Sequence, residues 1–374
     1  MLLLDGNLPT PLYAVYQERF GFSSTTLTLI FAVYAIALIP SLLVFGQLSD
    51  RIGRRPVIVG GLAVAALGLV LLAVAQSTAT LLVARAVQGL GLGTAVGTVP
   101  AALVELEPNG DHGRAAMAAV LGQSGGSAAG PLVAGALAQW APEPEKLCYL
   151  VGLVATVAAV VGVLLTREPR GETGEWRLQK PSVPALIRAG FTRASLTCAS
   201  SWAVGALFLS VVPSYAADLL DTSDLALLGA ISALMLAMAC LAQTVCLRGT
   251  MTPTRAQPLG LVSLIAGVAA LVLALPLHSL ALVLAAAVLA GGGLGFAYFG
   301  AQAEVNRLAP SDRRGEVTAA FITLVYAAVT VTAIGTGLLG DAISLSTAVA
   351  IMGSTVAVVA AATLAWHLRA AGRP

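Results

Sequence analysis

Two charged residues stand inside long apolar stretches, Asp5 in "LLLDGNLPTP" and Arg85 in "LLVARAVQGL". Desolvation favours the neutral form of a buried carboxyl group and a nearby arginine favours its charged form, so such a pair can take up and release a proton. A charge at the centre of a bilayer costs at least ~2.5 kcal/mol, which makes it unusual without a function. We therefore predict that Asp5 and Arg85 couple proton movement to the activity of the protein. The alternatives are an arginine that snorkels to the headgroups and an aspartate close to a frayed N-terminus.

A second set of polar and aromatic side chains within apolar stretches could line a binding cavity: Tyr34, Gln88, Gln123, Trp202, Tyr298, Gln302 and Tyr326. A mostly apolar and aromatic wall with scattered hydrogen-bonding groups suits amphipathic organic molecules better than sugars or phosphates. An enzyme embedded in a membrane would need paired acids, histidines or a nucleophile here, and the apolar stretches hold almost none. We expect no enzyme, no cofactor and no metal site, and the chain also lacks the Gly-Lys-Ser/Thr phosphate loop through which ATP would act.

These residues must be positioned by membrane-spanning helices. Hydrophobic residues make up 58% of the chain and charged residues only 10%, whereas soluble domains carry about 25% charged residues. Apolar runs of about 20 residues recur along the chain, each long enough to cross ~30 Å of hydrocarbon as a helix. We predict an all-α integral membrane protein with twelve transmembrane helices, at 1–17 (incomplete), 25–45, 57–75, 80–103, 114–139, 148–165, 194–217, 224–246, 258–277, 279–303, 316–340 and 344–367.

The basic residues predict the orientation of these helices. All lysines and arginines except Arg19, Lys146 and Arg85 fall on the side that holds the 46–56 loop, the linker and the C-terminal tail. By the positive-inside rule this side is cytoplasmic, so both termini lie in the cytoplasm. The basic residues thus serve the topology, and the net charge of +2 gives no reason to expect nucleic acid as a partner.

An internal repeat divides the chain. A shift of 202 positions places "GLG" at 91–93 on "GLG" at 293–295 and Pro56 on Pro258. We predict two pseudo-symmetric six-helix bundles, at 1–166 and 194–374, joined by a cytoplasmic linker at 167–193. Measured against this repeat, the first helix lacks about nine residues relative to the seventh. We expect either that the chain starts too late or that a naturally short first helix thins the bilayer around it.

The loop "GQLSDRIGRRP" at 46–56 lies between the second and third predicted helices. It resembles the loop between helices 2 and 3 of the major facilitator superfamily, Gly-x-Leu-x-Asp-Arg-x-Gly-Arg-Lys/Arg, at Gly46, Leu48, Asp50, Arg51, Gly53, Arg54 and Arg55. The resemblance extends over the whole chain apart from the start of helix 1, although the corresponding loop of the second half, "RGTMTPTRAQP" at 248–258, has lost the acid. The resemblance implies a secondary transporter of twelve helices.

We predict that this loop acts as a gating latch, formed by Gly46, Asp50, Arg51, Gly53, Arg54, Arg55 and Glu105. Gly46 and Gly53 would let the chain turn tightly between two helices. Asp50 would accept hydrogen bonds from the N-terminus of the eleventh helix, near Gly315. Arg54 would bridge to Glu105 or Glu107 only when the halves close on this side, which would favour the outward-open state. The alternative is that the arginines only fix the topology.

Two more stretches resemble patterns of the same family. "RAVQG" at 85–89 is similar to its Arg-x-x-Gln-Gly pattern, which implies that Arg85 faces the cavity and tunes a proton-carrying acid. "GSAAGPLVAGA" at 126–136 is similar to the antiporter pattern Gly-x-x-x-Gly-Pro-x-x-x-Gly, although its last glycine is replaced by Ala136. Its glycines would form a smooth strip for a neighbouring helix and its proline would kink the helix; the residues are Gly126, Gly130, Pro131 and Gly135.

We therefore predict a proton-coupled exporter of amphipathic small organic molecules that works by alternating access. Its partners would be the small-molecule substrate, protons and the lipid bilayer, and we expect a monomer in the inner (plasma) membrane. Two alternatives stay open. One is a proton-coupled importer of a small nutrient, and the other is a receptor or scaffold that transports nothing.

Overall fold

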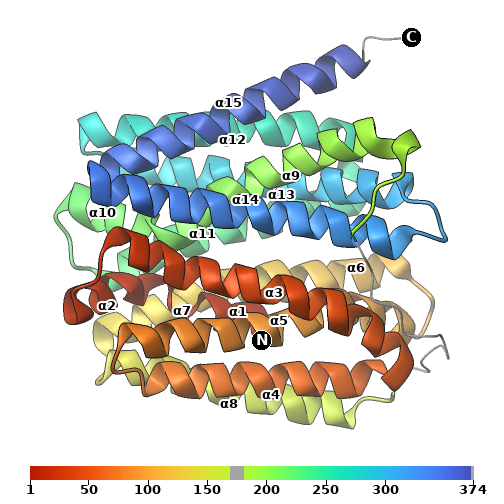
Figure 1. Cartoon of the computed structure of the whole chain (residues 1–374), viewed down its shortest axis with the longest axis horizontal. Coiled ribbons are helices and arrows are strands. Elements are labelled where there is room, and N and C mark those ends of the chain that lie inside the picture. The colour runs from red at the N-terminus through yellow and green to blue at the C-terminus, as the bar shows by residue number, and fades with distance from the viewer. Residues whose placement is uncertain (169–180, 372–374) are drawn as a thin grey trace.

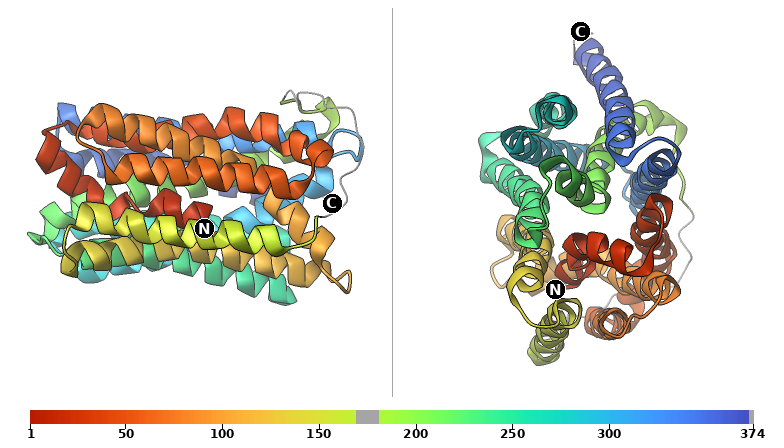
Figure 2. Two further views of the ribbon diagram at one scale, coloured as in Figure 1. Left: turned by 90° about the horizontal axis from the view of Figure 1, so that it is seen from below. Right: turned by 90° about the vertical axis from the view of Figure 1, so that its left-hand side faces the viewer.

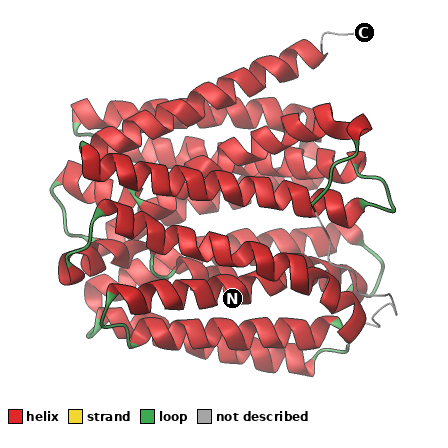
Figure 3. Ribbon diagram, in the orientation of Figure 1, coloured by secondary structure: helices red, strands yellow, loops and turns green. Residues whose placement is uncertain are grey.

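The structure is a computed structural model that describes residues 1–168 and 181–371, apart from the side chains at positions 46, 47, 50 and 371. The described residues form helices and connecting loops (Figure 3). In chain order the elements are α1 (Leu2–Asn7), η1 (Thr10–Leu12), α2 (Tyr13–Phe20), α3 (Ser24–Ile52), α4 (Arg54–Ala73), α5 (Thr78–Leu106), α6 (His112–Val120), η2 (Leu121–Gly125), α7 (Gly126–Trp140), α8 (Pro144–Leu165), η3 (Ala185–Ile187), α9 (Arg188–Ser210), α10 (Val212–Leu220), α11 (Leu225–Val245), η4 (Cys246–Thr250), α12 (Pro253–Leu277), α13 (Leu280–Leu308), α14 (Arg314–Ala342) and α15 (Leu345–Ala371).

The long helices run roughly parallel and antiparallel to one another along a single direction (Figure 1). The helices before residue 166, which we call the N-terminal half, gather on one side of the bundle seen end on, and those after residue 181, the C-terminal half, gather on the other (Figure 2, right). The end of the bundle with the 46–56 loop and the starts of α6, α9 and α14 carries most of the arginines. We call it the arginine-rich end, and the opposite end the arginine-poor end.

Within the described residues, nine helices are long and apolar enough to cross a membrane, or ten if the bent pair α9 and α10 is one span. The all-α membrane fold is therefore confirmed, although three of the twelve predicted helices are not continuous. In the first, proline at positions 9 and 11 supplies no N–H for a regular helix, and a 3₁₀ turn separates α1 from α2. In the fifth, a π turn in "LGQSG" separates α6 from α7. The seventh bends by 53° between α9 and α10, just before Pro213.

Glycines explain why the central helix of each half can lie close to its neighbours. On α5, a Cβ atom at Gly91 would come within 2.9 Å of the backbone nitrogen of Ala65 on α4. On α13, a Cβ atom at Gly293 would come within 2.8 Å of the backbone nitrogen of Leu264 on α12. These two glycines lie 202 residues apart, at the offset of the sequence repeat. Both "GLG" stretches are therefore packing surfaces, because only glycine leaves room for the neighbouring backbone.

This packing can be tested with two matched substitutions on α5. Gly91→Ala should lower the midpoint of thermal unfolding in detergent, since overpacking of a close contact costs about 1–3 kcal/mol. Gly97→Ala on the same helix should leave the midpoint unchanged or raise it, because nothing lies within 4 Å of a Cβ atom there. Equal midpoints for the two variants would contradict the close approach of α4 and α5.

Candidate functional site

The connection between α3 and α4 within the 46–56 stretch is shorter than the sequence suggested, because it consists of one residue, Gly53. α3 continues through Gly46 to Ile52, so Gly46 lies within a helix and not at a turn. Gly53 alone makes the turn, with a φ of 100° that favours glycine, and α4 begins at Arg54. The side chain of Asp50 lies outside the described residues, so its contact with the eleventh helix stays a prediction.

Arg54 forms the predicted ion pair, but the pair does not join the two halves. Its Nη2 lies 2.9 Å from Oε1 of Glu105, and its Nη1 donates to Ser49 at 2.7 Å. Glu105 ends α5, while Arg54 begins α4, and both helices belong to the N-terminal half. The expected dependence of this pair on closure of the halves stays a prediction. In this structure the pair ties α4 to α5 within the N-terminal half.

The two remaining arginines of the loop differ from each other. The backbone N–H of Arg55 donates to Oε1 of Glu168 at 3.2 Å, and its guanidinium donates to the carbonyl of Leu164 at the end of α8. Arg51 is exposed at the arginine-rich end. Arg55 thus holds α4 against α8 within the N-terminal half, and Arg51 is placed to contact headgroups or water.

Asp5 lies in α1 with its carboxylate inside the N-terminal half, where the side chain is 1% exposed. Its Oδ2 accepts a hydrogen bond from the hydroxyl of Thr156 on α8 at 2.7 Å. Its Oδ1 is buried and has no hydrogen-bond partner within the described part of the chain. A buried carboxylate with one oxygen unpaired is costly in its charged form, so this position favours a group that can also hold a proton.

The break after α1 explains why polar side chains gather around it. In a regular helix the carbonyl of Asp5 would accept from the N–H four residues later, but that residue is Pro9. The Nε2 of Gln88 on α5 donates to this carbonyl instead, at 3.1 Å. A backbone group in a bilayer must find a partner inside the protein, and here α5 supplies it.

Arg85 is buried beside the same turn and is 1% exposed. Its Nη1 donates to the carbonyl of Gly6 at 2.7 Å and to Oε1 of Gln88 at 2.8 Å, and its guanidinium lies over the ring of Tyr34 at 4.5 Å from the centroid. The guanidinium therefore ends inside the protein and does not snorkel to the headgroups. Arg85 makes no ion pair with Asp5 among the described residues; Gln88 links the two indirectly through the carbonyl of Asp5.

Asn7 connects α1 to the wall of the cavity between the halves. Its Nδ2 donates to the hydroxyl of Ser127 on α7 at 2.7 Å and to the carbonyl of Leu3 at 3.0 Å. Neither Asn7 nor Thr156 was singled out from the sequence. The signal was present for Asn7, because a buried amide two residues from a membrane aspartate needs a partner. Thr156 carried none, since a lone threonine in an apolar helix usually bonds its own backbone.

A cavity of ≈70 Å³ lies between the halves. Five of the seven residues predicted to line it do so: Gln123, Trp202, Tyr298, Gln302 and Tyr326. Tyr34 and Gln88 do not, because both are engaged in the cluster around Arg85. Ser124 and Gln243 also line the cavity but were not predicted from the sequence; Nε2 of Gln243 donates to the hydroxyl of Ser124 across the halves at 3.0 Å. Ring centroids of Trp202 and Tyr298 lie 6.1 Å apart in an edge-to-face arrangement on the wall of this cavity.

The cavity is smaller than a substrate and continues toward one end of the protein. A typical ligand pocket holds ~300 Å³ or more, so side chains or whole helices must move before a substrate can enter. A second, apolar cavity of ≈220 Å³ shares Leu3, Val96 and Gln123 with the first and extends along α5 to Leu103. The pair of cavities therefore leads from the middle of the protein toward the arginine-rich end.

The glycines of α7 divide into two groups. A Cβ atom at Gly130 would meet the carbonyl of Leu4 on α1 at 2.5 Å, and one at Gly135 would meet the carbonyl of Leu225 on α11 at 2.6 Å. Gly126 was expected in the same strip, but nothing lies within 4 Å of a Cβ atom there. α7 continues without a break through Pro131, whose carbonyl faces Gly229 of α11. The strip thus serves α1 on one side and the C-terminal half on the other.

Helices of two halves around a shared cavity, with a buried acid and arginine beside it, define a multi-pass membrane protein. Residues 1–333 match the Major Facilitator Superfamily, and the chain belongs to this family. It is 42% identical over 71 residues to the inner membrane transport protein YajR of Escherichia coli, which covers 19% of this chain and 16% of that protein. It is 28% identical over 186 residues to the puromycin resistance protein pur8 of Streptomyces alboniger, covering 48% and 36% of the two chains.

These curated relatives are matched over well under half of their own length. A solved structure agrees over nearly the whole chain. It is that of a bacterial homologue of the human lysosomal transporter Spinster in an inward-facing and unoccupied conformation, with a TM-score of 0.75, 16% identity, and coverage of 98% of this chain and 94% of that one. At this identity the likeness shows the fold, and the substrate and direction of transport must be argued from the site.

The cluster around Arg85 predicts a graded response to substitution. Arg85→Ala removes the donor to the backbone carbonyl of Gly6 and to Oε1 of Gln88. Each buried acceptor left without a donor lowers the free energy of unfolding by about 1–3 kcal/mol. Arg85→Lys keeps the charge and one donor but not the planar fork, so its thermal midpoint should fall between those of alanine and wild type. Tyr34→Phe keeps the ring face and should resemble wild type, whereas Tyr34→Leu should lower the midpoint. An Arg85→Ala protein as stable as wild type would contradict these contacts.

Proposed function

We propose that the protein is a proton-coupled exporter of amphipathic small organic molecules and that Asp5 carries the proton. The observation on which this rests is the position of α1 between two environments. On one side, the carboxylate of Asp5 is buried against Thr156 with Oδ1 unpaired. On the other side, Asn7 of the same short helix bonds to Ser127 on the cavity wall. A change in the charge of Asp5 would therefore alter a helix that also contacts the substrate space.

The wall of the central cavity supports the proposed class of substrate. Three glutamines, two serines and four large aromatic residues line it together with aliphatic side chains, and no charged side chain is among the described lining residues. Edge-to-face aromatic rings offer flat apolar contact, while the amides offer hydrogen bonds in either direction. Such a wall suits an amphipathic molecule with an aromatic or apolar body and a few polar groups. Organic phosphates would need cationic side chains that this wall lacks.

Two further arguments support export from the cytoplasm. The positive-inside rule assigns the arginine-rich end to the cytoplasm, and the two connected cavities lead toward that end. The names of two relatives, an inner membrane transport protein and a puromycin resistance protein, agree with an inner-membrane location and with efflux. A proton-coupled importer would use the same residues, and the direction of proton movement distinguishes the two.

The coupling is tested in vesicles of the purified protein with a pH reporter inside an acidic lumen. Amphipathic aromatic amines and amides, added outside, should make the lumen more alkaline as the compound enters in exchange for protons, whereas sugars and organic phosphates should not. Asp5→Asn should reduce this proton movement at least ten-fold, because an amide cannot carry a proton across. Its binding of the compound, followed by the fluorescence of Trp202, should be retained within a few-fold.

The matched control is Glu18→Gln, which neutralises an exposed acid of α2 and should leave proton movement unchanged. Proton movement in the same direction as the compound would replace export by import. Full proton movement in the Asp5→Asn variant would instead remove Asp5 from the proposal.

A further inference from the structure

The two halves are joined at the arginine-poor end by a related pair of side-chain contacts. The carboxylate of Asp341, near the end of α14, accepts hydrogen bonds from the backbone N–H groups of Ser24 at 2.7 Å and Thr25 at 3.0 Å. Oε1 of Gln139, near the end of α7, accepts from the backbone N–H of Leu225 at 2.9 Å. Ser24 and Leu225 are the first residues of α3 and α11. In each contact a side chain from one half caps a helix that starts in the other half.

The sequence repeat relates these contacts to each other. Gln139 and Asp341 lie 202 residues apart, at the offset that superposes the two halves. The capped residues Ser24 and Leu225 lie 201 residues apart, so their separation differs from the repeat offset by one residue. The α14–α3 contact and the α7–α11 contact are therefore equivalent positions in the two halves, and each half gives one capping side chain and receives another.

Close backbone packing occurs one helical turn before each capping side chain. A Cβ atom at Gly337 would meet the carbonyl of Ser24 at 2.8 Å, and one at Gly135 would meet the carbonyl of Leu225 at 2.6 Å. These glycines also lie 202 residues apart. Glycine at this position lets the helices approach until the side chain four residues later can reach the exposed N–H groups of the facing helix, since residues four apart lie on one face.

The helix starts need such a partner, because the first N–H groups of a helix have no acceptor within it. On α3, the N–H of Thr26 is satisfied locally by Ser23, which leaves those of Ser24 and Thr25 to Asp341. On α11, Asp224 of the same half satisfies the N–H of Leu227 and leaves that of Leu225 to Gln139. Each helix thus has one cap from its own half and one from the opposite half.

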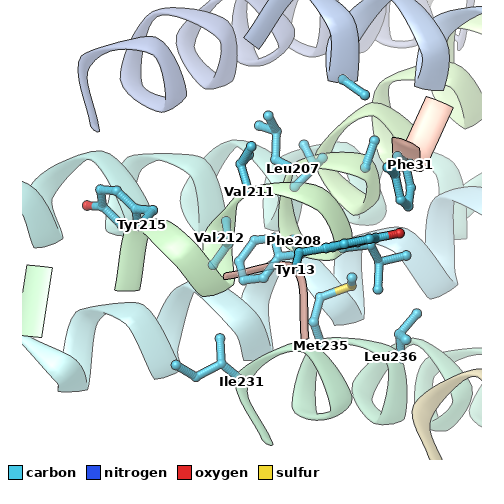
Figure 4. Packing of buried hydrophobic residues seen from close by; sticks show 14 of the residues in the cluster. Tyr13, Phe31, Leu207, Phe208, Val211, Val212, Tyr215, Ile231, Met235 and Leu236 are labelled. Atoms are coloured by element: carbon cyan, nitrogen blue, oxygen red, sulfur yellow. The ribbon is translucent and has the colours of Figure 1, made fainter. Parts of the chain in front are cut away.

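An apolar seal lies beside these caps. Tyr13 and Phe31 of the N-terminal half belong to one buried cluster with Phe208 and Met235 of the C-terminal half (Figure 4). This cluster closes the arginine-poor end, while the cavities lead toward the other end. Separation of the halves at the arginine-poor end would have to break both caps and expose the cluster.

We propose that Asp341 and Gln139 form a paired gate lock at the arginine-poor end, which holds the halves closed there by capping helices of the opposite half. In alternating access, the conformation closed at one end and the conformation closed at the other must differ little in free energy, so that the protein can pass between them. Exposed hydrogen-bonded caps supply this kind of modest stabilisation, and both capping residues lie at the exposed rim. Because one cap is a carboxylate and the other an amide, the Asp341 cap has the stronger interaction with the helix N-terminus.

The test measures the distance between the halves by pulsed electron spin resonance. Nitroxides at Gln76→Cys and Ser223→Cys report on the arginine-poor ends of the two halves, in a Cys240→Ser background, since the other native cysteines are buried. In the labelled protein with Asp341 and Gln139 intact, a short distance between the two nitroxides should dominate. Gln139→Ala should raise the ratio of the long to the short distance about five-fold, the factor expected for loss of one helix cap, and Asp341→Ala should raise it more because its cap is the stronger one. The double variant should raise it further.

The matched control is Asp224→Ala, which removes the cap that α11 receives from its own half. It should lower the thermal midpoint but leave the distance ratio unchanged, because no contact between the halves is lost. An unchanged ratio in the double variant would overturn the proposal, as would an equal change in the Asp224→Ala protein. The experiment needs no substrate, so its failure would leave the proposed export function untouched.

Discussion

The requirement that every polar backbone group in a bilayer find a partner inside the protein shapes the site. Pro9 removes the N–H that the carbonyl of Asp5 would use, and the first helix stops there. Gln88 donates a hydrogen bond to that carbonyl instead, and Arg85 donates to the carbonyl of Gly6 next to it. A buried arginine is therefore stabilised by a broken helix and by an aromatic ring, without an ion pair to any residue that the structure describes. The same break leaves α1 only six residues long, which suits the role proposed for Asp5 as the proton carrier.

The position of α1 then links the proposed proton carrier to the central cavity. Its residues face three different helices: Asp5 faces α8, the turn after it faces α5, and Asn7 faces α7 at the cavity wall. Protonation of a carboxylate changes both its charge and its hydrogen-bonding capacity. A rearrangement at Asp5 would therefore alter the hydrogen bond between Asn7 and Ser127, because Asp5 and Asn7 lie in the same turn of helix. The glycine of α7 that contacts α1, Gly130, keeps these elements close enough for that effect.

Much of the fold could be predicted from the sequence because hydropathy and charge act over whole segments. The runs of apolar residues, the repeat at 202 positions and the packing role of the "GLG" stretches follow from average properties and small residues. The site was harder, because it depends on which way single side chains point. Arg85 and Asp5 were found as isolated charges, but their separation by Gln88 was not. The Arg54 pair was expected to depend on closure of the halves, and the structure places both partners in one half. Thr156 gave no signal, since its role arises only when α8 lies against α1.

The central claim is that Asp5 is a titrating group in the folded protein, and infrared spectroscopy tests it most directly. Difference spectra of the membrane-embedded protein between acidic and alkaline pH should contain a protonated carboxylic acid band that reflects buried groups in low dielectric. One component of this band should be absent from the Asp5→Asn protein and should change frequency in Thr156→Val, which removes the hydroxyl bound to Asp5. Identical difference spectra for wild type and Asp5→Asn would contradict the claim, since Asp5 would then hold one protonation state throughout.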